Sequence, residues 1–357
     1  MIRVAVVGYG YWGPNLVRNF AANDGAVVEL ICDVSAKRLE AARKAWPSAA
    51  NTTEYRDVIK SSVDLVALSV PAALHYSMAK DAIDAGKHVL LEKPMCRSVA
   101  ECDDLIERAA HRGVRIFVDH TFVFTPQVRR MAAEAAGGNL GTLLYYDSVR
   151  INLGLFSQDA SVTWDLAPHD LSILDYILGG VMPHSVSCTE ATHFDGHHPN
   201  IAYLTLQYPN NFIAHVSMNW LAPVKVRQVV LCGTQRMVVY DETDPAEKVR
   251  IYDRGVTLAE GETERLHNAL IQYRVGDMHA PYLPNDEALA VEVAEIAACL
   301  SQGKEPTADH RMGRRVVRIL EMAEASARLG GAPVANVDQQ FASENSEQTA
   351  SAARRGR

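Results

Sequence analysis

The sequence feature that most constrains the fold is a glycine-rich turn near the start of the chain, Gly8-Tyr-Gly-Tyr-Trp-Gly13. The turn directly follows the apolar residues 3–7 and precedes a helical pattern opened by Pro14. In a strand–turn–helix unit, such glycines permit a tight turn, close approach of the backbone to a pyrophosphate, and close packing of helix on strand. The helix N-terminus offers oriented N–H groups to the phosphates. The turn therefore predicts dinucleotide binding, with contacts from Gly8, Gly10, Tyr11, Trp12 and Gly13.

The acidic residue Asp33 ends the second apolar run, 20 positions beyond Gly13. A carboxylate at this place accepts hydrogen bonds from the adenosine ribose hydroxyls and repels a 2′-phosphate. We therefore expect NAD as the cofactor. The nearby cations Lys37 and Arg38 leave some use of NADP open.

Short apolar runs alternate with helical patterns over the first third of the chain, as they do where helices cover both faces of a parallel sheet. The expected strands are residues 3–7, 27–32, 65–70, 88–91 and 115–118. The expected helices are residues 15–22, 36–45, 74–85 and 99–111. These elements predict an α/β protein whose residues 1–122 form a Rossmann NAD(P)-binding domain.

The pattern changes after this domain, because several strand-like runs follow one another without intervening helices. Helices are expected at residues 127–136, 164–178, 286–300 and 310–329, and strands at 143–151, 203–208, 212–220, 226–232, 236–240 and 249–252. Pro209-Asn-Asn predicts a hairpin turn between two of these strands. We therefore expect residues 123–337 to form an α+β domain with a large, mostly antiparallel open sheet, and residues 338–357 to be a disordered tail.

The charge and the cysteine content of the chain indicate which binding partners and which cellular compartment to expect. The formal net charge is −8 and no long basic cluster occurs, which argues against nucleic acid as a partner. The six cysteines are scattered without metal-ligand spacing, as expected of reduced thiols and of a protein without a metal site. No signal-peptide pattern and no apolar run of about 20 residues is present. The expectation is a cytoplasmic protein without a membrane partner.

Three further motifs carry a family resemblance. Ala85-Gly-Lys-His-Val-Leu-Leu-Glu-Lys-Pro94 is preceded by Ser69-Val-Pro-Ala-Ala-Leu-His75 and followed by Trp164-Asp-Leu-Ala-Pro-His-Asp170. These segments resemble the motifs of the glucose–fructose oxidoreductase, inositol dehydrogenase and rhizopine-catabolism (Gfo/Idh/MocA) family, and the resemblance extends over residues 1 to about 335. It implies a dehydrogenase that transfers a hydride between nicotinamide and a secondary alcohol or ketone of a sugar.

Within that family, Asn152-Leu-Gly-Leu-Phe156 and the motif at 164–170 resemble a subgroup that acts on nucleotide sugars, oxidising C3 of UDP-N-acetyl-hexosamine-type substrates. The same residues also serve a ketoreductase of deoxysugar or aminosugar biosynthesis, or a dehydrogenase of free sugars or inositol. A dinucleotide-binding regulator without catalytic activity is the alternative from another class of function.

The resemblance assigns catalysis to three residues. Lys93 follows a strand at the carboxyl edge of the sheet, where it would stabilise a developing alkoxide. His169 is the candidate base, because an imidazole titrates near neutral pH. Asp165 lies four positions earlier, where it would share a helical face with His169 or instead cap the helix with Pro168 in the first turn. Whether Lys93 or His169 takes the proton stays open.

The remaining candidates are contact residues. Val70, Pro71, His75, Glu92 and Lys93 are expected to line the cofactor site, and His120, Asn152 and Trp164 to contact the substrate. The strands after residue 200 carry apolar side chains on both alternations, for example Val229, Val230 and Leu231. A second apolar sheet face predicts a homodimer or homotetramer assembled through that sheet.

Overall fold

In the computed structural model, the N-terminal unit is a six-stranded parallel sheet with the strand order β3-β2-β1-β4-β5-β6. The structure describes residues 1–154, 160–194, 198–258 and 271–337. The strands are β1 (Ile2–Val7), β2 (Ala26–Cys32), β3 (Ala50–Thr52), β4 (Leu65–Leu68), β5 (His88–Glu92) and β6 (Ile116–Asp119). This is the order of a Rossmann sheet, in which ligands bind beyond the carboxyl ends of the strands. The expected fold of this part is confirmed.

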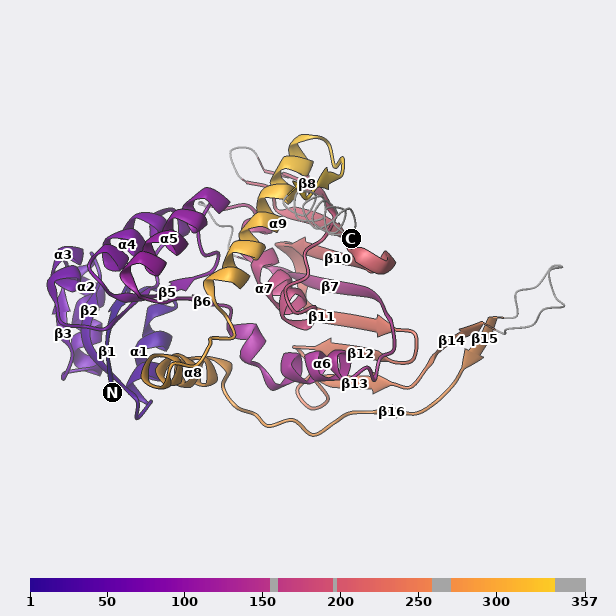
Figure 1. Cartoon of the computed structure of the whole chain (residues 1–357), viewed down its shortest axis with the longest axis horizontal. Helices are drawn as coiled ribbons and strands as arrows, with labels where there is room; N and C mark the ends of the chain where they lie inside the picture. The colour runs from indigo at the N-terminus through magenta and orange to yellow at the C-terminus, as the bar shows by residue number, and fades with distance from the viewer. Residues whose placement is uncertain (155–159, 195–197, 259–270, 338–357) are drawn as a thin grey trace, which may run out of the picture.

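Helices cover both faces of this sheet (Figure 1). They are α1 (Gly13–Ala21), α2 (Ala36–Ala45), α3 (Tyr55–Lys60), α4 (Ala72–Asp84) and α5 (Val99–Arg112). Helix α5 begins where Ser98 accepts a hydrogen bond from Glu101 N, and it ends at Gly113, whose φ of 66° suits glycine. Strand β3 and helix α3 are not among the elements expected from the sequence.

The second sheet has nine strands in the order β16-β13-β12-β11-β7-β10-β9-β8-β17. The strands are β7 (Leu143–Leu153), β8 (Ser185–Ala191), β9 (Ile201–Gln207), β10 (Ile213–Asn219), β11 (Leu221–Gly233), β12 (Met237–Asp241), β13 (Val249–Tyr252), β16 (Met278–His279) and β17 (Val334–Ala335). Only the pair β7–β10 is parallel among these described strands, so the expected mostly antiparallel sheet is confirmed. The expected hairpin turn joins β9 to β10, and Asn210 and Asn211 adopt positive φ values there.

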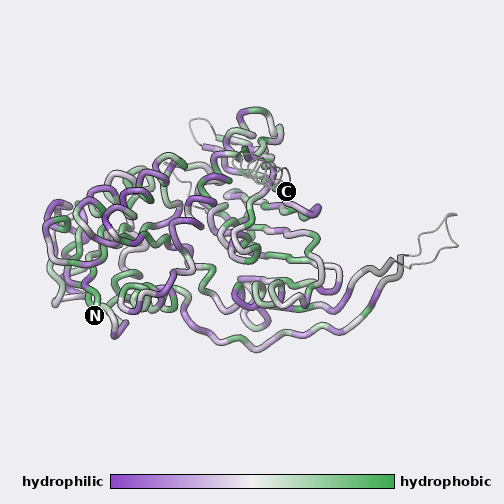
Figure 2. The backbone as a smooth tube through the Cα atoms, viewed as in Figure 1, coloured by the Kyte–Doolittle hydropathy of each residue, from purple (hydrophilic) through white to green (hydrophobic). Residues whose placement is uncertain are grey.

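One face of the nine-stranded sheet packs against helices and the other lies open (Figure 1). The covering helices are α6 (Pro126–Ala136), α7 (Val162–Ile177) and α9 (His310–Arg328). The short helix η1 (Thr121–Phe124) connects the two units, and the hairpin of β14 (Gly255–Leu258) and β15 (Ile271–Arg274) projects away from them. Figure 2 shows hydrophobic segments in the interior of both units and hydrophilic ones along their outer helices.

Helix α8 (Ala288–Gln302) returns from the C-terminal part of the chain to the N-terminal unit (Figure 1). Its residues Leu289, Val293 and Ile296 belong to the same buried core as Val4 and Leu16. The Rossmann core is therefore completed by a helix distant in sequence, although the periodicity of α8 predicted only that the segment is helical. No helix in the described ranges is long and apolar enough to span a bilayer.

Candidate active site

The glycine-rich turn has the shape required for a dinucleotide. A Cβ on Gly8, whose φ is +92°, would lie 2.0 Å from the Ser69 carbonyl oxygen, and one on Gly13 would lie 1.9 Å from the Gly8 carbonyl oxygen. These two glycines are required by the packing of the turn itself. At Gly10, in contrast, the nearest atom to such a Cβ is Arg38 Nη1 at 3.8 Å. The backbone at Gly10 thus faces open space that a pyrophosphate can enter, so the turn fits NAD.

Asp33 anchors this turn from the end of β2. Its carboxylate accepts hydrogen bonds from Tyr9 N and Ser35 N, both at 2.7 Å, and only 4% of the residue is exposed. Arg38 Nη1 lies 3.5 Å from Asp33 Oδ2, and 56% of the Arg38 side chain is exposed. The neighbouring Tyr11, also expected at the cofactor, is 93% exposed.

We expect the protein to bind NAD more tightly than NADP, because a 2′-phosphate would approach the Asp33 carboxylate. Dissociation constants for both cofactors, followed by tryptophan fluorescence, test this. Arg38→Gln should weaken NADP binding and leave NAD binding almost unchanged, since this exposed cation is the one beside Asp33. Equal or tighter binding of NADP by the wild-type protein would contradict the expectation.

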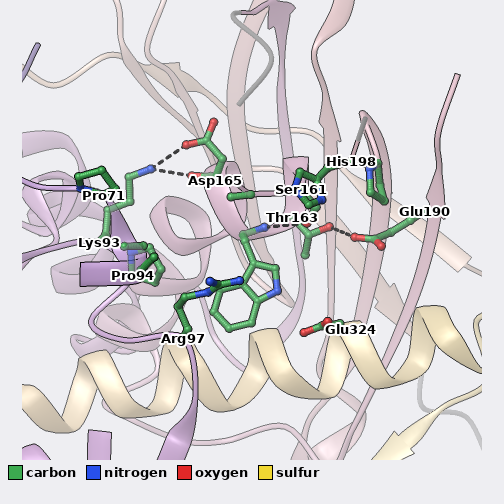
Figure 3. A pocket seen from close by; sticks show the side chains of 15 residues that line it. Pro71, Lys93, Pro94, Arg97, Ser161, Thr163, Asp165, Glu190, His198 and Glu324 are labelled. Carbon is green, nitrogen blue, oxygen red and sulfur yellow. Dashed lines mark hydrogen bonds and ion pairs between the residues drawn. The ribbon is translucent and has the colours of Figure 1, made fainter. Parts of the chain in front are cut away.

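Lys93 extends from the loop after β5 toward the start of α7. Its Nζ donates to the Asp165 carbonyl oxygen at 2.7 Å and to Asp165 Oδ1 at 3.0 Å (Figure 3). Helix α7 begins one turn before Asp165, and Ser161 Oγ is its cap, accepting from Trp164 N. Capping by Asp165 with Pro168 in the first turn is therefore not what the structure shows. The Asp165 carboxylate instead holds the Lys93 ammonium.

His169 lies one turn of α7 after Asp165 and is partly buried. Its ring makes an edge contact with Phe122, with centroids 5.0 Å apart. The guanidinium of Arg150 lies 4.7 Å from the centroid of the same Phe122 ring. Burial and the nearby Lys93 cation hold the pKa of His169 well below its usual value, so the imidazole is neutral at neutral pH.

His75 is buried behind the loops that were expected to line the cofactor site. Its Nδ1 lies 2.9 Å from the Pro94 carbonyl oxygen, and its Nε2 lies 3.0 Å from the Val70 carbonyl oxygen. Only 1% of His75 is exposed. The side chain therefore joins the loop after β4 to the loop that carries Lys93, and its contribution to the site is to position those loops.

A cluster of buried carboxyl groups lies beneath the loop that carries Lys93. Asp119, at the end of β6, accepts hydrogen bonds from Trp12 Nε1 at 2.6 Å and from Thr121 Oγ1. Glu92 and Glu292 lie within range of the Asp119 charge, while Glu92 Oε1 and both Glu292 oxygens have no hydrogen-bond partner among the described residues. Burial first, and the Asp119 charge second, raise the pKa of both glutamates well above the usual range. Sequence reasoning missed this cluster because its members come from three separate segments.

This cluster predicts that stability falls as the pH rises. Groups whose pKa is raised on folding contribute stability that is complete below their unfolded pKa of about 4.3 and is lost as the pH rises through the folded pKa. We expect the free energy of unfolding in urea to decrease from pH 5 to pH 9 and to decrease less steeply in Glu292→Gln. The exposed Glu40→Gln is the matched control. Parallel pH profiles of wild type and Glu292→Gln would contradict the prediction.

His120 is a further buried titratable group near Lys93. Only 1% of it is exposed, and neither ring nitrogen has a hydrogen-bond partner among the described residues. Burial lowers the pKa of His120 to about 4, so the ring is neutral. A buried imidazole without hydrogen-bond partners costs free energy.

A pocket of about 370 Å³ opens beside the Lys93–Asp165 pair, between the two units (Figure 3). Trp164 lines it, as expected of a substrate contact, whereas Asn152, His120 and His169 do not. Its other walls come from both units: Pro71, Ala72, Ala73, Pro94, Arg97, Ala160, Ser161, Thr163, Glu190, His198, Pro199 and Glu324. The glycine-rich turn follows β1 and Lys93 follows β5, so both lie at the carboxyl edge of the same parallel sheet.

A buried ion pair that the sequence analysis also missed fixes α7 to the sheet. Asp170 Oδ2 accepts from Arg150 Nε at 2.7 Å, and Oδ1 accepts from Ser148 Oγ at 2.7 Å and from Arg150 Nη2 at 3.2 Å. Both partners are at most 3% exposed. The signal was present, because Ser148 and Arg150 fall on the inward alternation of β7 and an inward arginine needs a buried acid.

Two protein-family models match the chain. The NAD-binding Rossmann-fold model of the GFO/IDH/MocA oxidoreductase family matches residues 2–120, and the GFO/IDH/MocA C-terminal domain model matches residues 128–239. Among curated relatives, D-apiose dehydrogenase of Paraburkholderia graminis is 23% identical over 91% of this chain and 88% of its own. An uncharacterised oxidoreductase of Streptococcus pneumoniae is 27% identical, with 60% of this chain aligned to 61% of that protein.

Solved structures share the fold along almost the whole chain. UDP-N-acetylglucosamine 3-dehydrogenase GnnA from Acidithiobacillus ferrooxidans has a TM-score of 0.78 at 20% identity, with 92% of this chain and 98% of that chain covered. The WlbA dehydrogenase from Bordetella pertussis, in complex with NADH and UDP-GlcNAcA, has a TM-score of 0.78 at 19% identity, with 94% and 97% covered. Because both domain models of one family match in order and together span more than half of the sequence, the chain belongs to the GFO/IDH/MocA family of NAD-binding oxidoreductases.

Proposed function

We propose that this chain catalyses the NAD-dependent oxidation of a secondary alcohol of a sugar, and that the substrate is a nucleotide sugar oxidised at C3, of the UDP-N-acetyl-hexosamine type. The observation that carries the proposal is the Lys93–Asp165 pair, which joins the cofactor-side loop after β5 to the helix that carries His169. The two structural neighbours named for UDP-sugars support the choice of substrate class.

The Lys93 ammonium provides the charge that the reaction needs. When bound, NAD accepts the hydride that leaves the carbinol carbon. The hydroxyl oxygen then develops negative charge, which a cation held in place stabilises without reorganisation. Asp165 holds Lys93 Nζ through two hydrogen bonds, and only 18% of the Lys93 side chain is exposed. The cation is therefore oriented before the substrate binds.

His169 is suited to receive the hydroxyl proton. Its low pKa keeps a ring nitrogen unprotonated at neutral pH, and the edge contact with Phe122 restrains the ring. The same low pKa means that His169 would hold the proton only briefly before releasing it to solvent. In the reverse direction, hydride addition to a ketone would form an alkoxide, and the Lys93 ammonium held by Asp165 would stabilise that alkoxide and donate a proton to it.

A substrate screen that follows the absorbance of reduced nicotinamide tests the proposal. It should compare UDP- and dTDP-sugars with free hexoses, pentoses, hexose phosphates and inositols, with NAD and the alcohols or with NADH and the corresponding ketones. We expect turnover with a UDP-N-acetyl-hexosamine or its uronic acid. Tight NAD binding without turnover of any sugar would instead favour a dinucleotide-binding regulator.

We also propose that the chain forms a homodimer or homotetramer through the open face of the nine-stranded sheet. Tyr203 on β9 and Ile213 on β10 lie on neighbouring strands of this face and are 47% and 43% exposed. Light scattering at micromolar concentration should give a multiple of 39.2 kDa, and Ile213→Glu should reduce that mass. A particle of 39.2 kDa for the wild-type protein would contradict this arrangement.

A further inference from the structure

The pocket beside Lys93 has charged side chains at both of its ends. Lys93 and Asp165 pair with each other at one end. At the other end, Glu190 on β8 accepts a hydrogen bond from Thr163 Oγ1, and Glu324 on α9 pairs with Arg328. Figure 3 shows Arg97 on the wall between these two ends. Each charged side chain in this set except Arg97 therefore already has a partner inside the protein.

Arg97 presents its guanidinium to the pocket without an ion pair in the described ranges of the chain. Its backbone N donates to Glu101 Oε2 at 3.0 Å, which fixes the main chain at the start of α5 and leaves the side chain exposed. A guanidinium offers several donors in one plane and binds phosphate or carboxylate oxygens through two parallel hydrogen bonds. An arginine in a substrate pocket without a partner is suited to an oxyanion of the ligand.

The spacing along the loop separates this arginine from the chemistry. Arg97 follows Lys93 by four residues, with Pro94 and the buried Met95 and Cys96 between them. The loop places Lys93 toward α7 and Arg97 on the same pocket wall (Figure 3). A substrate that reaches both side chains therefore carries its anionic group at a distance from the reacting hydroxyl, as a sugar with a phosphate or carboxylate substituent does.

We propose that Arg97 binds an oxyanion of the substrate, either a phosphate group attached to the sugar or a sugar carboxylate. This assignment rests on the proposed function, since it names the substituent that the sugar carries. Glu190 and Glu324 would oppose the same anion, because they add negative charge to the pocket. Arg97 would therefore favour an anionic substrate, and the two carboxylates would disfavour it. Removing the Arg97 charge should weaken the binding of an oxyanion, and removing a carboxylate charge should tighten it.

The test compares Arg97→Gln with Arg112→Gln, which removes an exposed positive charge on α5, outside the pocket. Calorimetry with UDP, glucose 1-phosphate and glucuronate measures the oxyanion site without turnover, and glucose is the neutral control. We expect Arg97→Gln to weaken the binding of at least one oxyanion by about 10- to 100-fold, with glucose unaffected and NAD affinity unchanged. UDP and glucose 1-phosphate distinguish phosphate from the carboxylate of glucuronate as the bound group.

Glu324→Gln should have the opposite effect on affinity, because it removes a negative charge from the pocket. It should tighten the binding of the same oxyanion by a few-fold. In kinetics with the substrate found by the screen, Arg97→Gln should raise KM and leave kcat within about three-fold. Failure of UDP, glucose 1-phosphate and glucuronate to bind the wild-type protein would overturn the assignment, as would equal affinities in wild type and Arg97→Gln. If oxyanions bind through Arg97 but no sugar is oxidised, the proposed function fails while the subsite stands.

Discussion

Lys93→Ala is expected to lower kcat by about 10²–10⁴-fold on the substrate that the screen identifies. The variant removes the cation that would stabilise the alkoxide and leaves Asp165 without its charged partner. NAD affinity should remain within a few-fold of wild type, because the pyrophosphate turn at Gly8–Gly13 has its own contacts with Ser69 and Asp33. Steady-state kinetics and cofactor titration on the same preparation provide both values.

His169→Ala and Asp165→Asn complete the series. The histidine variant should lose a similar factor in kcat, since it removes the neutral base. Asp165→Asn should lose less, because the asparagine side chain still accepts one hydrogen bond from Lys93 and Ser161 still caps the helix. Melting temperatures close to wild type for all three variants would show that the losses are catalytic. Near-wild-type turnover by Lys93→Ala or His169→Ala would remove that residue from the catalytic set.

The sequence predicted those parts of the fold that local patterns determine. Gly8 and Gly13 are required by contacts within one strand–turn–helix unit, and the apolar runs around them form the expected parallel sheet. Strand β3 was missed because its three residues, Ala50–Thr52, are too few to show a pattern. The periodicity of α8 predicted a helix, but the surface against which a helix packs depends on the tertiary fold.

In the candidate site, too, local motifs could be read from the sequence, whereas contacts between distant segments could not. Lys93, Asp165 and His169 could be proposed because each lies within a motif, and the structure joins the first two by hydrogen bonds. Capping of α7 by Asp165 stayed open as an alternative because serine and aspartate both suit an N-cap position, and the structure gives that position to Ser161. Contacts between distant segments could not be predicted. The bond from Trp12 Nε1 to Asp119 Oδ2 joins residues 107 positions apart, and the pattern around either residue gives no sign of the other.

The ion pair of Arg150 and Asp170 leads to the largest expected effect on stability. Asp170 is 1% exposed, and both of its oxygens accept hydrogen bonds from Arg150. Breaking such a pair from one side leaves a buried charge without compensation, which typically costs about 3–5 kcal/mol. We expect Asp170→Asn to lose about 3 kcal/mol in the free energy of unfolding, toward the lower limit because Glu242 Oε2 remains 3.6 Å from Arg150 Nη1.

Urea unfolding of Asp170→Asn beside Asp84→Asn measures this loss against a matched control. Asp84 also accepts from an arginine, Arg108, but 39% of its side chain is exposed, so its removal should cost less than about 1 kcal/mol. Asp170→Asn should also lose activity, because Arg150 lies against the Phe122 ring that restrains His169. If Asp170→Asn unfolded within 1 kcal/mol of wild type, the buried pair would not be what fixes α7, and with it His169, to the sheet.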